Sequence, residues 1–552
     1  AQVKLQETVS VKDFGAVGNG VTDDTAAIQA ALNSGSLFVY FPKGTYEAQG
    51  LSIPSNVNVF GEKKGTVLRD QTAAVSRTMF TLLGSGISIK DMVIEGGQGS
   101  STSTYYNQNT AITNTNDGND YSDISISGVE IRGWGDGGIT IYRPERVYVH
   151  HNYIHNCGRH GIFYIGGKNS HMHDNYIDNI APGSGGSSPF INAYGVSLTC
   201  DISEVGFPQP DSCTIKNNVI KNVSTWEGID IHGAVNFEII GNIVTDCLIG
   251  AFIGPATGTN QQMCNHGIIS DNTFNNVDNT YSRSAVLLSP SYNVGSLFGK
   301  QFVVSGNIIY GHGLNPATYA AGYTDFEGAI EVVGVRDAVI ANNSILNASQ
   351  IGIHLEQEIL GCLVNGNRVT DMGLTNSVGI AFKCEDSSSV IGEVIGNTWH
   401  RLSGSSISAV EVLGTPTSTF GIRYGINHHL GSWASIFTSG SLANLHDDSQ
   451  WNRRVIAHAY VTNSGTAAIA EGYGMASVNR TSTGVVNVTL ADTQPDALYT
   501  VQVTPISGSF RVAQVGSGVT TTAFNVYTWD GTNALIDNAF FVTVHGQIGS
   551  QE

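Results

Sequence analysis

The middle of this sequence repeats one short phrase, which reads apolar, any, any, asparagine, any, apolar. Nine asparagines mark it: Asn152, Asn175, Asn218, Asn242, Asn272, Asn307, Asn343, Asn367 and Asn397. The shortest step, from Asn152 to Asn175, is 23 residues, and the longest, from Asn175 to Asn218, is 43. A constant unit that tolerates insertions is typical of stacked repeats, in which each unit contacts its neighbours.

The residues around each asparagine alternate in polarity. The third residue before it and the second after it are apolar in all nine phrases, as with Ile239 and Val244 around Asn242. A period of two indicates β-strands, because a helix would show a 3.6-residue period over ten or more residues. The uneven steps argue against a β-propeller, whose four-stranded blades recur at a regular spacing.

We therefore predict an all-β fold, with a right-handed parallel β-helix from residue 45 to residue 412. Each repeated asparagine is expected at a turn. There its side chain can bond to the asparagines of the coils above and below, and its backbone can adopt the left-handed conformation.

The two ends of the chain follow other patterns. In VTDDTAAIQAAL, Asp23 or Asp24 can cap a short helix with Ile28, Ala31 and Leu32 on one face, so residues 1–44 are expected to cap the first coil. We expect a linker over residues 413–450. Alternating strands at 484–490, 499–503, 510–515, 523–529 and 540–545 predict a C-terminal antiparallel β-sandwich over residues 451–552.

Charge and composition exclude several functions. Lys and Arg number 26 against 45 Asp and Glu, a net charge of −19, and no basic cluster is present, so nucleic-acid binding is disfavoured. No apolar run is long enough to span a bilayer, so we expect no membrane insertion. The seven cysteines show no CxxC spacing and are expected to be free thiols.

The N-terminal segment VSVKDFGAVGNGVTDDTAAIQAA (residues 9–31), followed by FVYFPKGTY (38–46), resembles the N-terminal motif of the pectate-lyase-like β-helix superfamily. It is most similar to the version in bacteriophage tailspikes and capsule depolymerases, and the C-terminal portion resembles tailspike trimerisation domains. The resemblance implies a homotrimeric virion protein, joined to a phage tail or baseplate adaptor, that binds and cleaves bacterial capsule or O-antigen polysaccharide at the cell surface.

A second column of residues, about ten positions beyond each asparagine, lies in the next strand of each coil and is expected to face outward. We expect this one sheet to display aromatic and ionisable side chains together, and to carry the glycan-binding groove. Two acidic clusters compete for the catalytic role. One contains Glu227 and Asp230 with Trp226 and His232, and the other contains Glu327, Glu331, His354 and Glu356.

Glycosidic hydrolysis requires a protonated acid and a second carboxylate, roughly 6.5–9.5 Å apart for inversion or about 5–5.5 Å for retention. Glu331 and Glu356 lie one coil and two residues apart, which places their Cα atoms about 8 Å apart. Asp230 is three coils from Glu331, about 14 Å along the sheet. The catalytic candidates are Glu227, Asp230, Glu331 and Glu356. The candidates for substrate binding are Tyr142, Phe163, Trp226, His232, Glu327, His354 and Lys383.

The primary hypothesis is an endo-acting glycoside hydrolase. A polysaccharide lyase, with His354, Tyr142 or Lys383 as base, is the alternative, although a lyase needs cationic help on a uronate and this column offers only Lys383. A non-catalytic adhesin that uses the same groove is a third hypothesis. No cofactor is expected, and no metal, because no second histidine matches the position of His354.

Overall fold

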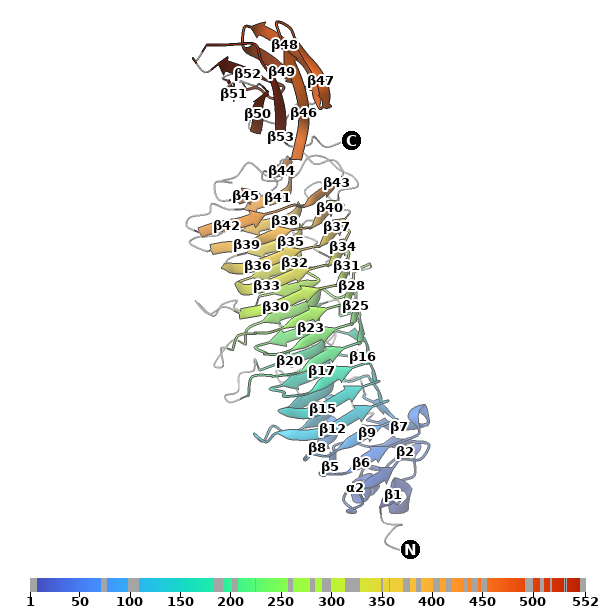
Figure 1. Ribbon diagram of the computed structural model, residues 1–552. Helices are drawn as coiled ribbons and strands as arrows, with labels where there is room; N and C mark the ends of the chain where they lie inside the picture. The colour runs from blue at the N-terminus through green and yellow to red at the C-terminus, as the bar shows by residue number, and fades with distance from the viewer. Residues whose placement is uncertain are drawn as a thin grey trace. The chain divides into compact units, whose positions relative to one another are not determined.

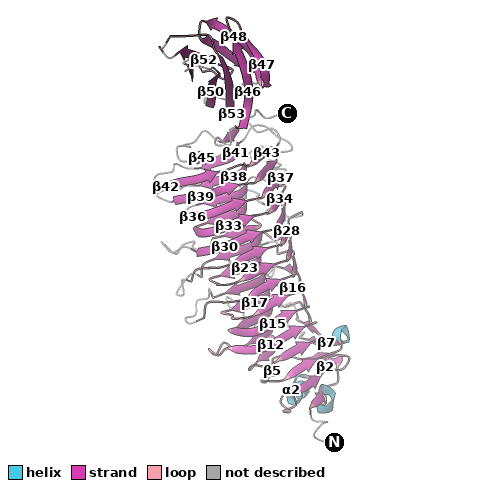
Figure 2. Cartoon of the chain, viewed as in Figure 1, coloured by secondary structure: helices cyan, strands magenta, loops and turns pink. Residues whose placement is uncertain are grey.

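The computed structural model describes residues 7–70, 77–97, 109–181, 192–200, 207–223, 225–256, 262–277, 283–289, 299–312, 328–348, 351–356, 358–370, 378–383, 389–400, 408–413, 419–430, 435–437, 445–447, 454–491, 500–506, 511–516, 519–530, 532 and 534–546. The chain divides into two compact units, Ala1–His446 and Asp447–Glu552. Among the described residues of the first unit, strands predominate and helices occur at its N-terminal end (Figure 2). These are the α-helix α2 (Thr25–Leu32) and two short 3₁₀ helices, Val11–Phe14 and Lys63–Gly65.

The first unit is a parallel β-helix, whose described strands form three sheets that each coil extends by one strand (Figure 1). The first sheet contains β1 (Thr8–Ser10), β3 (Phe38–Tyr40), β6 (Asn58–Phe60), β9 (Ser88–Lys90), β12 (Tyr121–Ser127), β15 (Pro144–His150), β18 (His171–His173), β21 (Thr214–Lys216), β24 (Glu238–Ile240), β27 (Ile268–Ser270), β30 (Gly299–Ser305), β33 (Val335–Ala341), β36 (Ile359–Asn365), β39 (Ser389–Ile395), β42 (Thr419–Tyr424) and β45 (Leu445–Asp447). The second sheet contains β2 (Asn19–Asp23), β4 (Gly44–Glu47), β7 (Thr66–Arg69), β10 (Val93–Glu95), β13 (Glu130–Arg132), β16 (Tyr153–Cys157), β19 (Tyr176–Ile180), β22 (Val219–Lys221), β25 (Ile243–Thr245), β28 (Thr273–Asn275), β31 (Ile308–Tyr310), β34 (Ser344–Leu346), β37 (Arg368–Thr370), β40 (Thr398–His400) and β43 (His428–Leu430). The third sheet contains β5 (Leu51–Ile53), β8 (Thr78–Leu82), β11 (Thr110–Asn114), β14 (Gly137–Tyr142), β17 (His160–Ile165), β20 (Tyr194–Thr199), β23 (Glu227–His232), β26 (Ile249–Gly254), β29 (Val286–Leu288), β32 (Gly328–Val333), β35 (Ile351–Glu356), β38 (Val378–Lys383), β41 (Ser408–Leu413) and β44 (Ser435–Phe437).

The apolar columns predicted from the sequence form the interior of the helix. Ile215 pairs in register with Ile239, as Ile340 does with Val364, and all four side chains are buried in one continuous core. Side chains of similar shape from successive coils thus fill the space between the sheets. The predicted all-β fold with a parallel β-helix is confirmed.

The repeated asparagines form a hydrogen-bonded ladder inside the turn between the first and second sheets. Asn218 Nδ2 donates to Asn242 Oδ1 at 3.0 Å, and Asn242 Nδ2 donates to Asn272 Oδ1 at 2.9 Å. Asn242 Nδ2 also donates to the carbonyl oxygen of Ile215, so both the amide nitrogen and the amide oxygen of this buried side chain have hydrogen-bond partners. The predicted left-handed backbone lies one residue earlier than expected, as at Asn217 (φ 54°), because the chain bends before the ladder asparagine turns inward.

The N-terminal segment is both a cap and the start of the helix. As predicted, Ile28, Ala31 and Leu32 of α2 are buried. Asp24 stands at the N-cap position, but its carboxylate accepts hydrogen bonds from the backbone N–H groups of Val17 and Gly18. Strands β1 to β4 already pair within the first and second sheets, so residues before 45 contribute to the coils.

The expected linker over residues 413–450 is wrong where the structure describes it, because β42 to β45 continue the three sheets. Asn427 Oδ1 extends the ladder by accepting from Asn397 Nδ2 at 2.9 Å. The repeat around Asn427 was not recognised in the sequence because His429 stands at the second position after the asparagine, where the other repeats have an apolar residue. Burial lowers the pKa of His429 to about 4, so a neutral ring fills that place and bonds to the Tyr424 hydroxyl.

The second unit has its own core. Strands β47 (Ala467–Tyr473), β46 (Arg454–Asn463), β53 (Ala539–Gly546) and β50 (Thr500–Ile506) form one antiparallel sheet, and β48 (Met475–Ser482), β49 (Val485–Leu490), β52 (Ala523–Asp530) and β51 (Arg511–Val515) form another. Val461, Val488, Phe524 and Val542 from both sheets share one buried cluster. The last three lie in predicted strands, whereas β46, which carries Val461, was not predicted as a strand. Within the described residues, no helix has the length and apolar character needed to cross a bilayer.

Candidate active site on the third sheet

The outer face of the third sheet carries the predicted column of polar and aromatic residues. In β23, Ile229 and Ile231 point into the core, and Asp230 and His232 alternate with them on the other face. Asp230 pairs in register with Ser197 of β20, and Glu331 of β32 pairs with His354 of β35. The sequence therefore predicted which residues share this face.

The expectation that this face is exposed is wrong. Tyr142 is 6% exposed and Phe163 is 3% exposed, because other rings pack over them. The Tyr142 ring lies 6.0 Å from that of Phe207, and the Phe163 ring lies 6.0 Å from that of Tyr194. These side chains form an outer apolar cluster, separate from the core of the helix.

Glu227 begins β23, and Asp230 lies three residues later in the same strand. Asp230 Oδ2 accepts a hydrogen bond from Ser197 Oγ at 2.6 Å, and Asp230 Oδ1 lies 3.0 Å from His232 Nε2. His232 Nδ1 lies 2.9 Å from the carbonyl oxygen of Pro255, which orients the ring, and its Nε2 forms an ion pair with Asp230 when the imidazole is protonated. Asp230 is thus held by groups from two neighbouring coils.

Glu227 holds its proton more tightly than an ordinary glutamate. Burial raises its pKa well above the usual value, and the negative charge of Asp230 and a hydrogen bond to Asp230 raise it further. The buried Arg283 opposes this shift but does not reverse it. A protonated carboxyl therefore lies directly beside a second carboxylate, the arrangement in which one group acts as acid and the other as base.

Glu331, His354 and Glu356 form a second, enclosed cluster. His354 Nδ1 lies 2.9 Å from Glu331 Oε1, and the backbone N–H of Gly328 donates to Glu331 Oε2 at 3.0 Å. All three side chains are buried, and one donor atom of each lies within 4.8 Å of the others. This donor set could hold a metal ion, whereas the sequence analysis expected none because no second histidine matches the position of His354.

The two clusters differ in their access to solvent. The His232 side chain is 21% exposed, and Trp226 is half-buried where it packs against two outer apolar clusters. The second cluster has no comparably exposed member among its described residues. Glu327 and the Lys383 side chain lie outside the described part of the chain. Of the two clusters, the one that contains Glu227 and Asp230 therefore has the more accessible neighbours, although both carboxyl groups are themselves buried.

Ser197 and Arg283 are the two described neighbours of this pair that sequence reasoning missed. Ser197 stands in the outward column one coil before Asp230, so the repeat alone could have placed it next to Asp230. Arg283 precedes β29 and belongs to no repeated column, so only the folded chain brings its charge close to Glu227.

Two family models match the chain. Residues 8–82 match "Rhamnogalacturonase A/epimerase, pectate lyase-like", and residues 80–252 match "Right handed beta helix region". The second match gives the hand of the helix and includes Glu227 and Asp230.

Curated relatives share parts of this sequence. Mannuronan C5-epimerase AlgE1 of Azotobacter vinelandii is 29% identical over 222 residues, covering 32% of this chain and 16% of that protein. The pre-neck appendage protein of Bacillus phage phi29 is 32% identical over 164 residues, covering 28% of this chain and 16% of its own. The chain thus matches about a sixth of the length of these relatives. Among solved structures, the Dettilon tailspike protein is 11% identical with a TM-score of 0.42, over 98% of this chain and 94% of that one.

Proposed function

Because two pectate-lyase-like and β-helix family models match this chain, we propose that it is a phage tailspike that depolymerises bacterial surface polysaccharide by endo-glycosidic hydrolysis. The observation that carries the proposal is the raised pKa of Glu227, which keeps an acid protonated beside Asp230. The similarity to a phage appendage protein supports a place on the virion.

In the proposed reaction, Glu227 donates its proton to the glycosidic oxygen as the bond to the leaving sugar breaks. Asp230 acts either as the base that activates a water molecule or as the nucleophile that attacks the anomeric carbon of the sugar. Ser197 and His232 hold the Asp230 carboxylate and stabilise its negative charge. Glu227 and Asp230 are hydrogen-bonded to each other, so their carboxyl groups lie closer together than in either an inverting or a retaining hydrolase. In the proposed reaction, bound substrate therefore separates the two carboxyl groups.

Glu227→Gln and Asp230→Asn test this assignment. We expect each to lower kcat for polysaccharide cleavage by about 10²–10⁴-fold, because each removes one proton-transfer group while keeping the side-chain shape. Release of reducing ends measures the rate, and circular dichroism checks the fold. Glu238→Gln, in β24 of the first sheet, is the matched control and should keep full activity. If Glu331→Gln abolishes cleavage in a folded chain while Glu227→Gln does not, the assignment to β23 is wrong.

The similarity to a mannuronan C5-epimerase favours one second candidate, a lyase-type reaction that begins with proton abstraction beside a uronate carboxylate. Lyase products carry a new ultraviolet-absorbing double bond, and hydrolase products do not. Chromatography of digested polysaccharide with ultraviolet detection separates the two reactions. Binding without any product would instead indicate an adhesin.

A further inference from the structure

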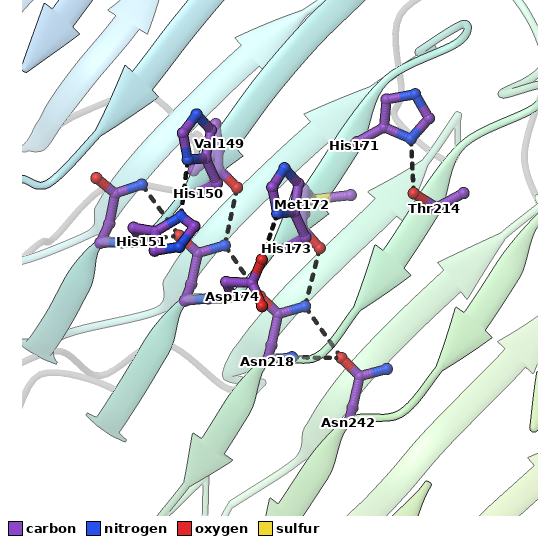
Figure 3. Close-up of polar contacts among 12 residues, drawn as sticks. Val149, His150, His151, His171, Met172, His173, Asp174, Thr214, Asn218 and Asn242 are labelled. Atoms are coloured by element: carbon purple, nitrogen blue, oxygen red, sulfur yellow. Dashed lines mark hydrogen bonds and ion pairs between the residues drawn. The ribbon is translucent and has the colours of Figure 1, made fainter. Parts of the chain in front are cut away.

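A cluster of three histidines and one aspartate lies on the outer face of the first sheet, on strands that do not contribute to the proposed active site (Figure 3). His150 ends β15 and His173 ends β18, and these two residues pair in register across neighbouring coils. His151 and Asp174 follow them directly, at equivalent turn positions. The repeat therefore brings four potential metal ligands from two coils together.

The side chains of this cluster already contact one another. His150 Nδ1 lies 2.9 Å from His151 Nδ1, and His173 Nδ1 lies 2.7 Å from Asp174 Oδ2. The rings of His150 and His173 stack in parallel, 4.9 Å apart. One donor atom each from His151, His173 and Asp174 lies within 4.8 Å of the other two. The Asp174 side chain is 37% exposed and His151 is exposed, so an ion can reach them from solvent.

The backbone gives no reason for a histidine at position 151. Its φ is 57°, in the left-handed region. In the other described coils where this turn position is left-handed, the residue is glycine, asparagine or aspartate, and Ile426, before Asn427, is not left-handed. Those left-handed residues are Asp91, Gly128, Asp174, Asn217, Gly241, Asp271, Gly306, Asn342, Gly366 and Gly396. Histidine adopts this conformation more readily than most side chains, as His266 also does, but glycine, asparagine and aspartate are the usual residues in it. His151 is the one histidine among these equivalent turn positions.

We propose that His151, His173 and Asp174 bind a late first-row divalent metal ion such as Zn²⁺, with water completing the coordination. Two imidazole nitrogens and a carboxylate oxygen are typical zinc ligands, whereas Ca²⁺ and Mg²⁺ prefer all-oxygen sites. Donors on a tetrahedral zinc ion lie about 3.4 Å apart, so these exposed and half-buried side chains would need to move by at most about 1.5 Å. His150 holds the His151 ring through its Nδ1 and acts as a positioning residue. The bound ion links the turns of two successive coils.

The test is zinc titration of the full chain, made without an affinity tag and freed of metal by a chelator. Isothermal titration calorimetry is expected to show one Zn²⁺ bound per chain through this cluster, and His151→Asn and His173→Asn are each expected to weaken the affinity at least about 100-fold. Asparagine is the residue that other coils place at this turn, so His151→Asn should fold with an unchanged or higher Tm. Zinc should raise the Tm of the wild-type chain, but not that of His151→Asn.

The matched control is His266→Asn. His266 is also an exposed, left-handed histidine (φ 54°), and it bonds to Asn236 instead of a second histidine or a carboxylate. This variant should bind zinc as the wild type does. His354→Asn removes the buried donor set on the third sheet. Zinc binding that survives in His151→Asn and disappears in His354→Asn would overturn the proposal, as would equal binding in all variants.

Discussion

At the scale of the residue, one proton on Glu227 determines whether the proposed site can act as an acid. Burial and the charge of Asp230 raise the pKa of Glu227 well above its ordinary 4.5, so the protonated form persists to higher pH. We expect kcat/KM for polysaccharide cleavage to fall as the pH rises through this raised pKa. Initial rates across the pH range measure this, and an alkaline limb that persists in Glu227→Gln would contradict it. The folded chain also holds a proton that the unfolded chain loses, so this group lowers the free energy of unfolding as pH rises from 4.5 to the raised pKa.

At the scale of the element, glycines set the distance between the third sheet and the core. A Cβ at Gly195 in β20 would lie 2.5 Å from the carbonyl oxygen of Gly228 and 2.5 Å from Ile220 Cγ2. Gly195→Ala must therefore push β20 away from β23, and we expect it to lower the free energy of unfolding by about 1–3 kcal/mol. It should also lower activity, because β20 carries Ser197. Gly65→Ala, where the nearest atoms are 3.5 Å away, should change neither quantity in urea unfolding and rate assays.

At the scale of the whole molecule, the second unit exposes aromatic side chains that a monomer would leave in water. Phe541 is 43% exposed beside the ring of Tyr460, and Tyr473 is more exposed still. Such side chains favour association, and the resemblance of this unit to tailspike trimerisation domains implies a trimer, so we expect a mass of three times 58.4 kDa by light scattering. Phe541→Ser should weaken the trimer, and Leu83→Ser, at an exposed apolar residue of the first unit, should not. A mass of 58.4 kDa at every concentration would contradict this expectation.

The sequence by itself determined the strands, their register and the apolar columns. These follow from local alternation and from a repeat that brings like residues together, as Ile215 and Ile239 do. It also identified the residues that share the outer face of the third sheet. Strands β42 to β45 escaped because His429 departs from the apolar pattern.

Only the tertiary structure decided which of the candidate side chains are covered and which charges meet. Phe207 packs over Tyr142, and Arg283 reaches Glu227, although neither residue belongs to a repeated column. The histidine cluster likewise depends on a contact between coils. Burial and electrostatic coupling depend on groups far apart in the chain, whereas the strand period is a property of neighbouring residues, and for this reason the sequence alone could not rank the two acidic clusters.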